Sequence, residues 1–162
     1  MSKLEEFLKQ AKVDYYNGDP SISDEVYDRL EEQVGATAVG TDEGTRIPHM
    51  FPMYSLQKVY KGEKDPHTVL KHWAQVTPKL DGAAVSLQYI NGELSMALTR
   101  GDGKKGLDIT DKMRELVPNT IFSKQPKQIT GEVVAPKEIP NARNYAAGAL
   151  NLKDVEEFKK RD

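Results

Sequence analysis

The sequence predicts an α+β protein, in which a small N-terminal helical hairpin precedes a domain built mainly from antiparallel strands. Apolar residues of segment 4–11 recur at the i, i+3, i+4, i+7 spacing of an amphipathic helix. Further along, Asn91-Gly92 separates two segments of alternating polarity, a strong signal for a two-residue β-hairpin. Another strand-like segment follows at 128–135. Helices are therefore expected first, and an antiparallel sheet after them.

A second helix is expected soon after the first. The segment Asn17-Gly18-Asp19-Pro20 predicts a turn. Ser23 is a suitable N-cap, with acidic residues directly after it, and Gly35 is placed where a C-terminal cap would fall. These signals predict two helices packed as a hairpin.

The chain is expected to divide after this hairpin into a helical module at 1–40 and a second unit at 41–162. Residues 36–52 are rich in Gly, Thr and Pro, and predict a linker. The elements expected after the linker are, in order, strands at 83–90 and 93–99, a helix at about 109–116, a strand at 128–135 and a helix from 154.

Composition limits the possible functions. The 162 residues suffice for one ordinary domain, or for an incomplete domain with a helical appendage. A formal net charge of −2 exerts no general attraction on nucleic acid, so contact with DNA requires a local basic patch or another chain.

Cysteine is absent, which excludes disulfides and cysteine-ligated zinc, and three histidines do not predict a structural metal site. No apolar stretch approaches the roughly 20 residues of a membrane span, and the first residues lack a signal-peptide core. A cytoplasmic protein without membrane association is expected.

The segment Thr-Pro-Lys-Leu-Asp-Gly at 77–82 is the strongest candidate for catalysis. In a strand, Lys79 and Asp81 would point to the same face and place an ammonium beside a carboxylate in one pocket. A lysine nucleophile must first lose its proton, which burial or a neighbouring cation promotes. Taken alone, the pair is better explained as an ion pair at a strand edge.

Six motifs, in order over about 130 residues, resemble the front half of NAD-dependent DNA ligases. They are Tyr-Tyr-Asn-Gly-Asp-Pro-Ser-Ile-Ser-Asp-Glu-Val-Tyr-Asp at 15–28, Pro-Met-Tyr-Ser-Leu at 52–56, Lys-Leu-Asp-Gly at 79–82, Thr-Arg-Gly-Asp-Gly at 99–103, Gly-Glu-Val at 131–133 and Asn-Ala-Arg-Asn-Tyr-Ala-Ala-Gly at 141–148. The resemblance implies an incomplete nucleotidyltransferase (adenylation) domain preceded by a helical module that binds nicotinamide mononucleotide (NMN).

The resemblance also implies an activity. Lys79 would attack the α-phosphorus of NAD, release NMN and keep AMP as a phosphoramidate, which then activates a DNA 5′-phosphate for nick sealing in replication and repair. Mg²⁺ is the expected metal cofactor. The residues implied to be catalytic are Lys79, Asp81 and Glu132. The residues implied to bind the cofactor are Tyr15, Tyr16, Asp24, Tyr27, Asp28, Ser55, Leu56, Thr77, Lys79, Arg100, Glu132 and Arg143.

By the same resemblance, Arg100 serves the ribose and phosphate region, Glu132 the ribose hydroxyls and the metal, and Arg143 nucleotide or DNA phosphates. Outside the motifs, each would be interpreted as an ordinary surface residue, and Asp102 as a turn residue. The helical module supplies tyrosine faces for a cationic pyridinium and carboxylates to neutralise it. Core packing is the alternative role for one of these tyrosines.

The chain departs from the family pattern in three respects. Thr77 stands where a glutamate often recognises adenine, and Asn151 stands where a second arginine often follows a longer segment after Glu132. Later core strands and DNA-encircling domains are also missing from the sequence.

We therefore expect the N-terminal subunit of a split ligase, from a bacteriophage, that acts on nicked double-stranded DNA with a second subunit carrying the remaining motifs. The alternatives are a fragment of a longer ligase and a catalytically inactive NAD-binding or regulatory module.

Overall fold

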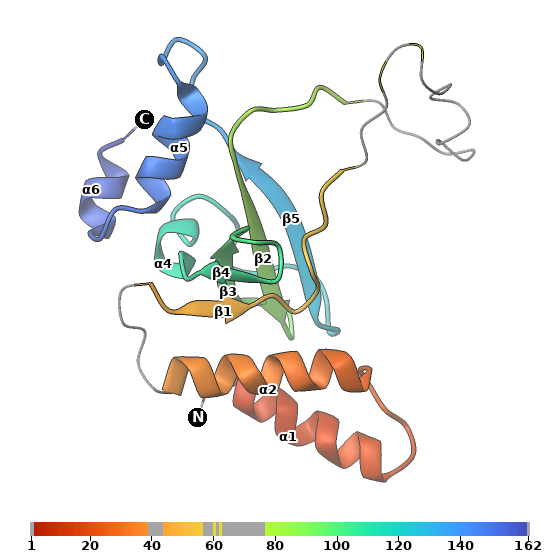
Figure 1. Cartoon of the computed structure of the whole chain (residues 1–162). Coiled ribbons are helices and arrows are strands. Elements are labelled where there is room, and N and C mark those ends of the chain that lie inside the picture. The colour runs from red at the N-terminus through yellow and green to blue at the C-terminus, as the bar shows by residue number, and fades with distance from the viewer. Residues whose placement is uncertain (1, 39–43, 57–59, 61, 63–76, 162) are drawn as a thin grey trace.

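The computed structural model describes residues 2–38, 44–56, 60, 62 and 77–161 (Figure 1). The N-terminal hairpin consists of α1 (Lys3–Tyr16) and α2 (Asp24–Ala38), as predicted. Ser2 and Glu5 form a capping box at the start of α1, and Ser23 Oγ accepts a hydrogen bond from the Val26 amide at 3.4 Å. Gly35 is not the C-cap that we expected. It lies inside α2, because its φ is not positive and the alanines after it continue the helix.

The predicted β-hairpin is confirmed by β2 (Ala83–Ile90) and β3 (Glu93–Thr99). Asn91 and Gly92 have φ angles of 51° and 80°, the left-handed pair that a type I′ turn requires. The third expected strand is β5 (Lys127–Val133), which pairs antiparallel with β2 and gives the order β3-β2-β5.

The fold differs from expectation in three places. Within the predicted linker, β1 (Arg46–Pro48) pairs with β4 (Lys105–Leu107) in a small second sheet. The helix expected at 109–116 is the single turn α4 (Thr110–Met113). The expected C-terminal helix is α6 (Val155–Lys159), and α5 (Ala142–Leu150), which we did not predict, precedes it.

Two hydrophobic clusters flank the three-stranded sheet. Val85, Leu87 and Tyr89 of β2 are buried beneath α4, α5 and α6, against side chains that include Leu150 and Phe158. At the opposite end of the molecule, the helical hairpin packs on β2 through a second cluster that contains Leu30, Met50 and Ile90, all fully buried (Figure 1). The sheet is thereby fixed between the hairpin and the C-terminal helices.

A buried amide pair joins α2 to the sheet. Gln33 and Gln88 each donate a hydrogen bond to the other's Oε1 at 3.0 Å, and Gln33 Nε2 also donates to the Pro48 carbonyl at 2.7 Å. Both side chains are buried, so their bonds replace those that water would otherwise make. The pair thus fixes the hairpin in one orientation.

We expect Gln33→Leu to lower the free energy of unfolding by about 1–3 kcal/mol, because it removes the donor to the buried Gln88 Oε1 and to the Pro48 carbonyl. Urea denaturation monitored by circular dichroism measures the loss. The double variant Gln33→Leu/Gln88→Leu should recover part of it, since no unpaired amide then remains. Equal stability of the single variant and the unchanged chain would contradict a structural role for the pair.

Candidate active site and nucleotide pocket

The segment that carries Lys79 runs into β2 beside β5. β2 begins only at Ala83, so Lys79 and Asp81 precede the strand, and our expectation that they share a strand face is not met. Both side chains are exposed. A Cβ on Gly82 would lie 2.1 Å from the Val133 carbonyl oxygen, so only glycine permits this approach of the segment to β5.

Three of the predicted residues gather around this approach. Glu132 Oε1 accepts a hydrogen bond from the Gly82 amide at 3.1 Å, and Glu132 lies opposite Ala84 in the sheet. Arg143, near the start of α5, places Nη1 4.0 Å from Asp81 Oδ1. Both side chains of this ion pair are largely exposed, so it contributes little stability. The pair nevertheless directs an arginine toward the lysine segment.

Arg100 joins the same region from the end of β3. Its amide donates to the Ala84 carbonyl at 3.0 Å, and its Nη2 donates to Ser55 Oγ at 2.7 Å. The structure thus brings together two of the residues predicted to contact the nucleotide. Leu56 and Thr77 are exposed, and within the described residues neither forms a hydrogen bond with the other predicted residues.

Asp102 builds the turn after Arg100, which agrees with its interpretation from the sequence as a turn residue. Its Oδ1 accepts from the amides of Lys104 and Lys105 at 2.9 and 2.8 Å, and these bonds hold the pKa of the carboxyl below its ordinary value. Gly103 has a φ of 90°, and a Cβ there would lie 2.8 Å from the Met53 carbonyl oxygen. The turn therefore lies close against the segment that carries Ser55.

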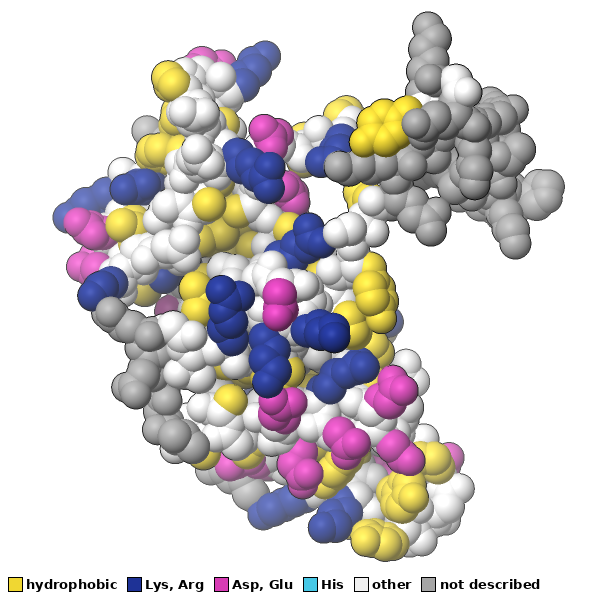
Figure 2. All heavy atoms as spheres, in the orientation of Figure 1, with side chains coloured by type: hydrophobic (Ala, Val, Ile, Leu, Met, Phe, Trp, Pro, Cys, Tyr) yellow, Lys and Arg dark blue, Asp and Glu magenta, His cyan; other side chains and the backbone are white. Residues whose placement is uncertain are grey.

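Basic side chains gather over this turn. Four of them come from β1, β4 and the turn: Arg46, Arg100, Lys104 and Lys105. Figure 2 shows Lys and Arg side chains grouped in the middle of this face, with acidic side chains over the helical hairpin beside them. Although the chain has a net charge of −2, it presents the local basic patch that contact with phosphate requires.

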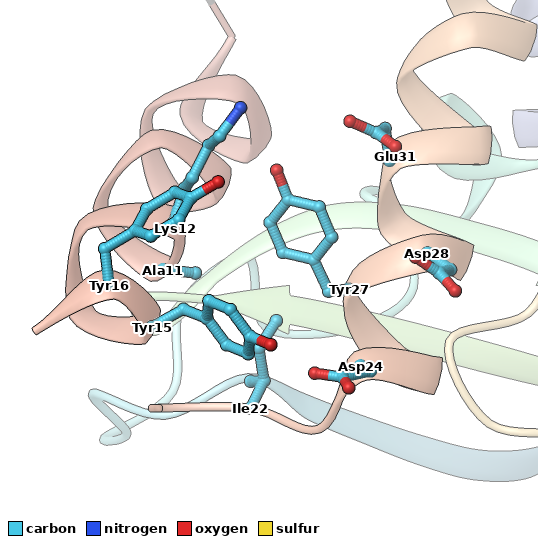
Figure 3. Close-up of a pocket in the computed structure, with 9 residues that line it drawn as sticks. All are labelled: Ala11, Lys12, Tyr15, Tyr16, Ile22, Asp24, Tyr27, Asp28 and Glu31. Atoms are coloured by element: carbon cyan, nitrogen blue, oxygen red, sulfur yellow. The ribbon is translucent and has the colours of Figure 1, made fainter. Parts of the chain in front are cut away.

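The other predicted residues line a cavity of about 390 Å³ between α1 and α2 (Figure 3). Its lining includes Tyr15, Tyr16, Asp24, Tyr27 and Asp28. The ring centroids of Tyr15 and Tyr16 are 5.8 Å apart in an edge-to-face arrangement. The cavity thus places aromatic faces of α1 opposite carboxylates of α2, a combination that suits the binding of a cationic ring.

The cavity also contains Lys12 and Glu31, which the sequence analysis missed. The helical spacing of the sequence could have identified both residues as neighbours of the predicted ones. Lys12 lies three and four residues before the two tyrosines of α1, and Glu31 lies three residues after Asp28 on α2. Lys12 is the one cationic side chain among the residues that line this cavity.

The cavity and the lysine segment lie apart. Figure 1 shows the helical hairpin at one end of the molecule and the entry to β2 toward the other. The described arrangement therefore does not by itself place a ligand of the cavity over Lys79.

His49 is a further residue that the sequence analysis missed. Its ring is 1% exposed and contacts both Ser86 and the Arg100 carbonyl. Burial lowers the pKa of the imidazole, although the Arg100 carbonyl and the charge of Asp102 oppose the shift.

No group of three or more His, Asp or Glu able to hold a metal ion occurs among the described residues. Within the same residues, no helix combines the length and the apolar character that crossing a membrane requires.

Comparison with known proteins identifies this arrangement. Residues 42–162 match the family model of the NAD-dependent DNA ligase adenylation domain. The chain belongs to this family. It is 32% identical to a DNA ligase of Metamycoplasma arthritidis over an alignment covering 94% of the chain, and 31% identical to a DNA ligase of Corynebacterium aurimucosum over 99% of it. A DNA ligase of Sulfurimonas denitrificans is 33% identical over 94% of the chain.

These relatives are much longer. The chain spans about 31% of the first and 30% of the other two. The alignments run over 196 to 212 positions, more than the 162 residues of the chain, so the relatives carry insertions relative to it. The alignments cover nearly the whole chain and so include most of the helical hairpin, which lies before the start of the family match.

Proposed function

We propose that this chain performs the adenylation step of an NAD-dependent DNA ligase, with Lys79 as the nucleophile. The observation that carries the proposal is the convergence of three predicted residues on the segment directly after Lys79: Arg143 faces Asp81, Glu132 binds the Gly82 amide and Arg100 binds the Ala84 carbonyl. Membership of the adenylation family supports it.

The proposed reaction transfers AMP from NAD to lysine. The unprotonated Lys79 amine donates its electron pair to the α-phosphorus, a phosphorus–nitrogen bond forms, and the bond from that phosphorus to the bridging oxygen breaks. NMN leaves with the electron pair of that bond, and the proton lost by the lysine passes to solvent. Arg100 and Arg143 neutralise charge that develops on the phosphate oxygens.

Among the described residues, the site offers carboxylates for Mg²⁺ but no complete set of protein ligands. It is commonly held by one or two carboxylates together with substrate phosphates, and does not require a cage of protein ligands. Asp81 and Glu132 are the carboxylates nearest to the proposed reaction, since both flank Gly82. They would hold the ion, which supplies positive charge against the phosphate oxygens.

Intact mass after incubation with NAD and Mg²⁺ tests this proposal. The expected result is a mass increase of one AMP, located on Lys79 by peptide mapping. An inactive NAD-binding module, the alternative function, would bind NAD and show no covalent adduct.

We also propose that the cavity between α1 and α2 holds the NMN half of NAD. NMN joins a cationic ring to an anionic phosphate, and the cavity offers carboxylates on one helix and Lys12 on the other (Figure 3). The pyridinium would lie between the tyrosines beside Asp24 and Asp28, with the phosphate at Lys12.

We expect Lys12→Met to weaken the binding of NMN by about 5- to 30-fold, the range of one charge-assisted contact. Nicotinamide riboside, which lacks the phosphate, should bind the variant and the unchanged chain alike. Calorimetric titration measures both ligands, with Lys137→Met as the control because Lys137 is exposed and does not line the cavity. An equal loss for both ligands would place the phosphate elsewhere.

Because the cavity and Lys79 lie apart, NAD transfer requires the helical hairpin to leave the orientation that the Gln33–Gln88 pair holds and to turn toward the entry of β2. Glu32 and Lys105 form an ion pair of 2.5 Å between α2 and β4, and the chain has no cysteine. Glu32→Cys/Lys105→Cys, joined by a short bifunctional maleimide, should therefore still bind NMN but form no AMP adduct. The unlinked double variant is the control. Full adduct formation in the linked form would show that no such movement is needed.

We propose finally that nick sealing needs protein beyond these residues, supplied by the same polypeptide or by a second subunit. β5 is an edge strand, and Ile129 and Val134 beside this edge are 43% and 47% exposed. An exposed strand edge with apolar side chains beside it is a place where natural proteins add protection, such as a covering helix or loop. The residues 1–162 with NAD, Mg²⁺ and a labelled nicked duplex should give no multiple-turnover sealing, and efficient sealing would refute the requirement.

A further inference from the structure

His49 occupies the point where three segments of the site meet. The ring lies between β1, to which it is adjacent, β2 and the turn that follows β3. Nδ1 is 2.8 Å from Ser86 Oγ, and Nε2 is 3.0 Å from the Arg100 carbonyl oxygen. Both ring nitrogens are therefore engaged by the protein itself.

The partners determine the tautomer. A carbonyl oxygen only accepts hydrogen bonds, so Nε2 must carry the proton that points at Arg100. In the neutral ring, Nδ1 then accepts from the Ser86 hydroxyl. With both nitrogens so occupied and the ring buried, His49 has no group left to act on a substrate or a metal.

Neighbouring residues hold the amide, the carbonyl and one guanidinium nitrogen of Arg100. Its amide is fixed to Ala84 at 3.0 Å, and its carbonyl accepts from His49 and, at 2.9 Å, from the Gly103 amide. Its guanidinium donates to Ser55 Oγ. The His49 ring is the only side-chain donor to the Arg100 carbonyl among the described residues.

The surrounding backbone does not depend on the imidazole. The His49 amide donates to the Lys104 carbonyl at 2.9 Å, and the Met53 amide donates to the Gly103 carbonyl at 2.8 Å. These bonds hold segment 49–53 against the turn whatever side chain stands at position 49. Loss of the ring is thus expected to remove one of the two hydrogen bonds to the Arg100 carbonyl, and so to loosen that peptide group, while the fold persists.

We infer that His49 is a positioning residue, which fixes the Arg100 peptide group and so directs the guanidinium toward the nucleotide phosphates. The inference rests on the proposed function, because Arg100 matters only if a nucleotide binds there. His49, although buried, thereby acts in AMP transfer entirely through the Arg100 side chain.

Two substitutions separate positioning from packing. The amide nitrogen of glutamine can occupy the place of Nε2 and donate to the Arg100 carbonyl, whereas the shorter asparagine reaches only the place of Nδ1. We expect His49→Asn to slow adduct formation at saturating NAD by on the order of 10- to 100-fold, the usual effect of a small misplacement. His49→Gln should remain within about 3-fold of the unchanged chain.

The variant Ile47→Ala controls for general destabilisation, since Ile47 is fully buried in β1 and belongs to a separate cluster with Met96 and Leu98. This variant should lower the melting temperature and leave the rate of adduct formation at a permissive temperature unchanged. The double variant His49→Asn/Arg100→Ala should be no slower than Arg100→Ala alone, because His49 acts through Arg100.

Nuclear magnetic resonance of the ring nitrogens gives a readout that is independent of activity. The spectrum of His49 should show the neutral form protonated at Nε2. A ring protonated at Nδ1, equal rates for the asparagine and glutamine variants, or a further loss in the double variant would overturn the inference. Absence of any adduct in the unchanged chain would instead overturn the proposed function.

Discussion

Lys79→Ala is expected to abolish the covalent AMP adduct completely. The alanine side chain has no atom able to form the phosphorus–nitrogen bond, and Lys79 is the one lysine of segment 77–82, which Gly82 allows to approach β5. The measurement is intact mass after incubation with NAD and Mg²⁺. Because the Lys79 side chain is exposed, the free energy of unfolding should change by less than about 0.5 kcal/mol.

Two further variants make this test specific. Lys79→Arg retains a positive charge but offers no amine that loses its proton near neutral pH, so it should also form no adduct. Lys137→Ala removes another exposed lysine and should react at the normal rate. An adduct on Lys79→Ala, at any position, would assign the nucleophile to another residue.

The elements predicted correctly from the sequence are those set by local signals. Helical spacing at 4–11 and the Asn91-Gly92 turn each need only their own neighbourhood, and both are confirmed. In contrast, β1 and β4 have three residues each and pair residue 46 with residue 107, so no local pattern identifies them. α5 was missed because its small residues, Ala-Ala-Gly-Ala at 146–149, give a weak periodic signal.

The site shows the same limit. The motifs identified residues that the structure then gathers around Gly82 and in the cavity of the hairpin. The same-face geometry of Lys79 and Asp81 was wrong because it required both residues to lie in a strand, whereas the strand, correctly predicted at 83–90, starts after them. His49 was missed because its partners lie 37 and 51 residues away, and only the folded chain brings them together.

The helical hairpin should decide which nucleotide donates AMP, and this is the second large effect that we expect. If ATP donated the AMP, the leaving group would be pyrophosphate, which has no cationic ring for the aromatic rings and carboxylates of the cavity to bind. NMN carries such a ring. The chain should therefore take AMP from NAD and not from ATP.

Deleting the hairpin is a poor test of this expectation. Met50, Ile90 and Gln88 are buried beneath α1 and α2, so removal of residues 1–35 would expose the sheet as well as remove the cavity. Point substitutions inside the cavity avoid that damage. Tyr15→Leu/Tyr27→Leu keeps apolar bulk, which Tyr27 needs because it packs partly against the hairpin core.

The double variant should react with NAD on the order of 100-fold more slowly, since each lost cation–π contact is worth about 1–2 kcal/mol. In the assembled ligase, sealing of a nick that already carries AMP should be unchanged, because that step no longer involves NMN. Tyr60→Leu is the matched control, because Tyr60 is exposed and does not line the cavity. An unchanged NAD reaction in the double variant, or AMP transfer from ATP at a comparable rate in the unchanged chain, would show that the hairpin does not select the cofactor.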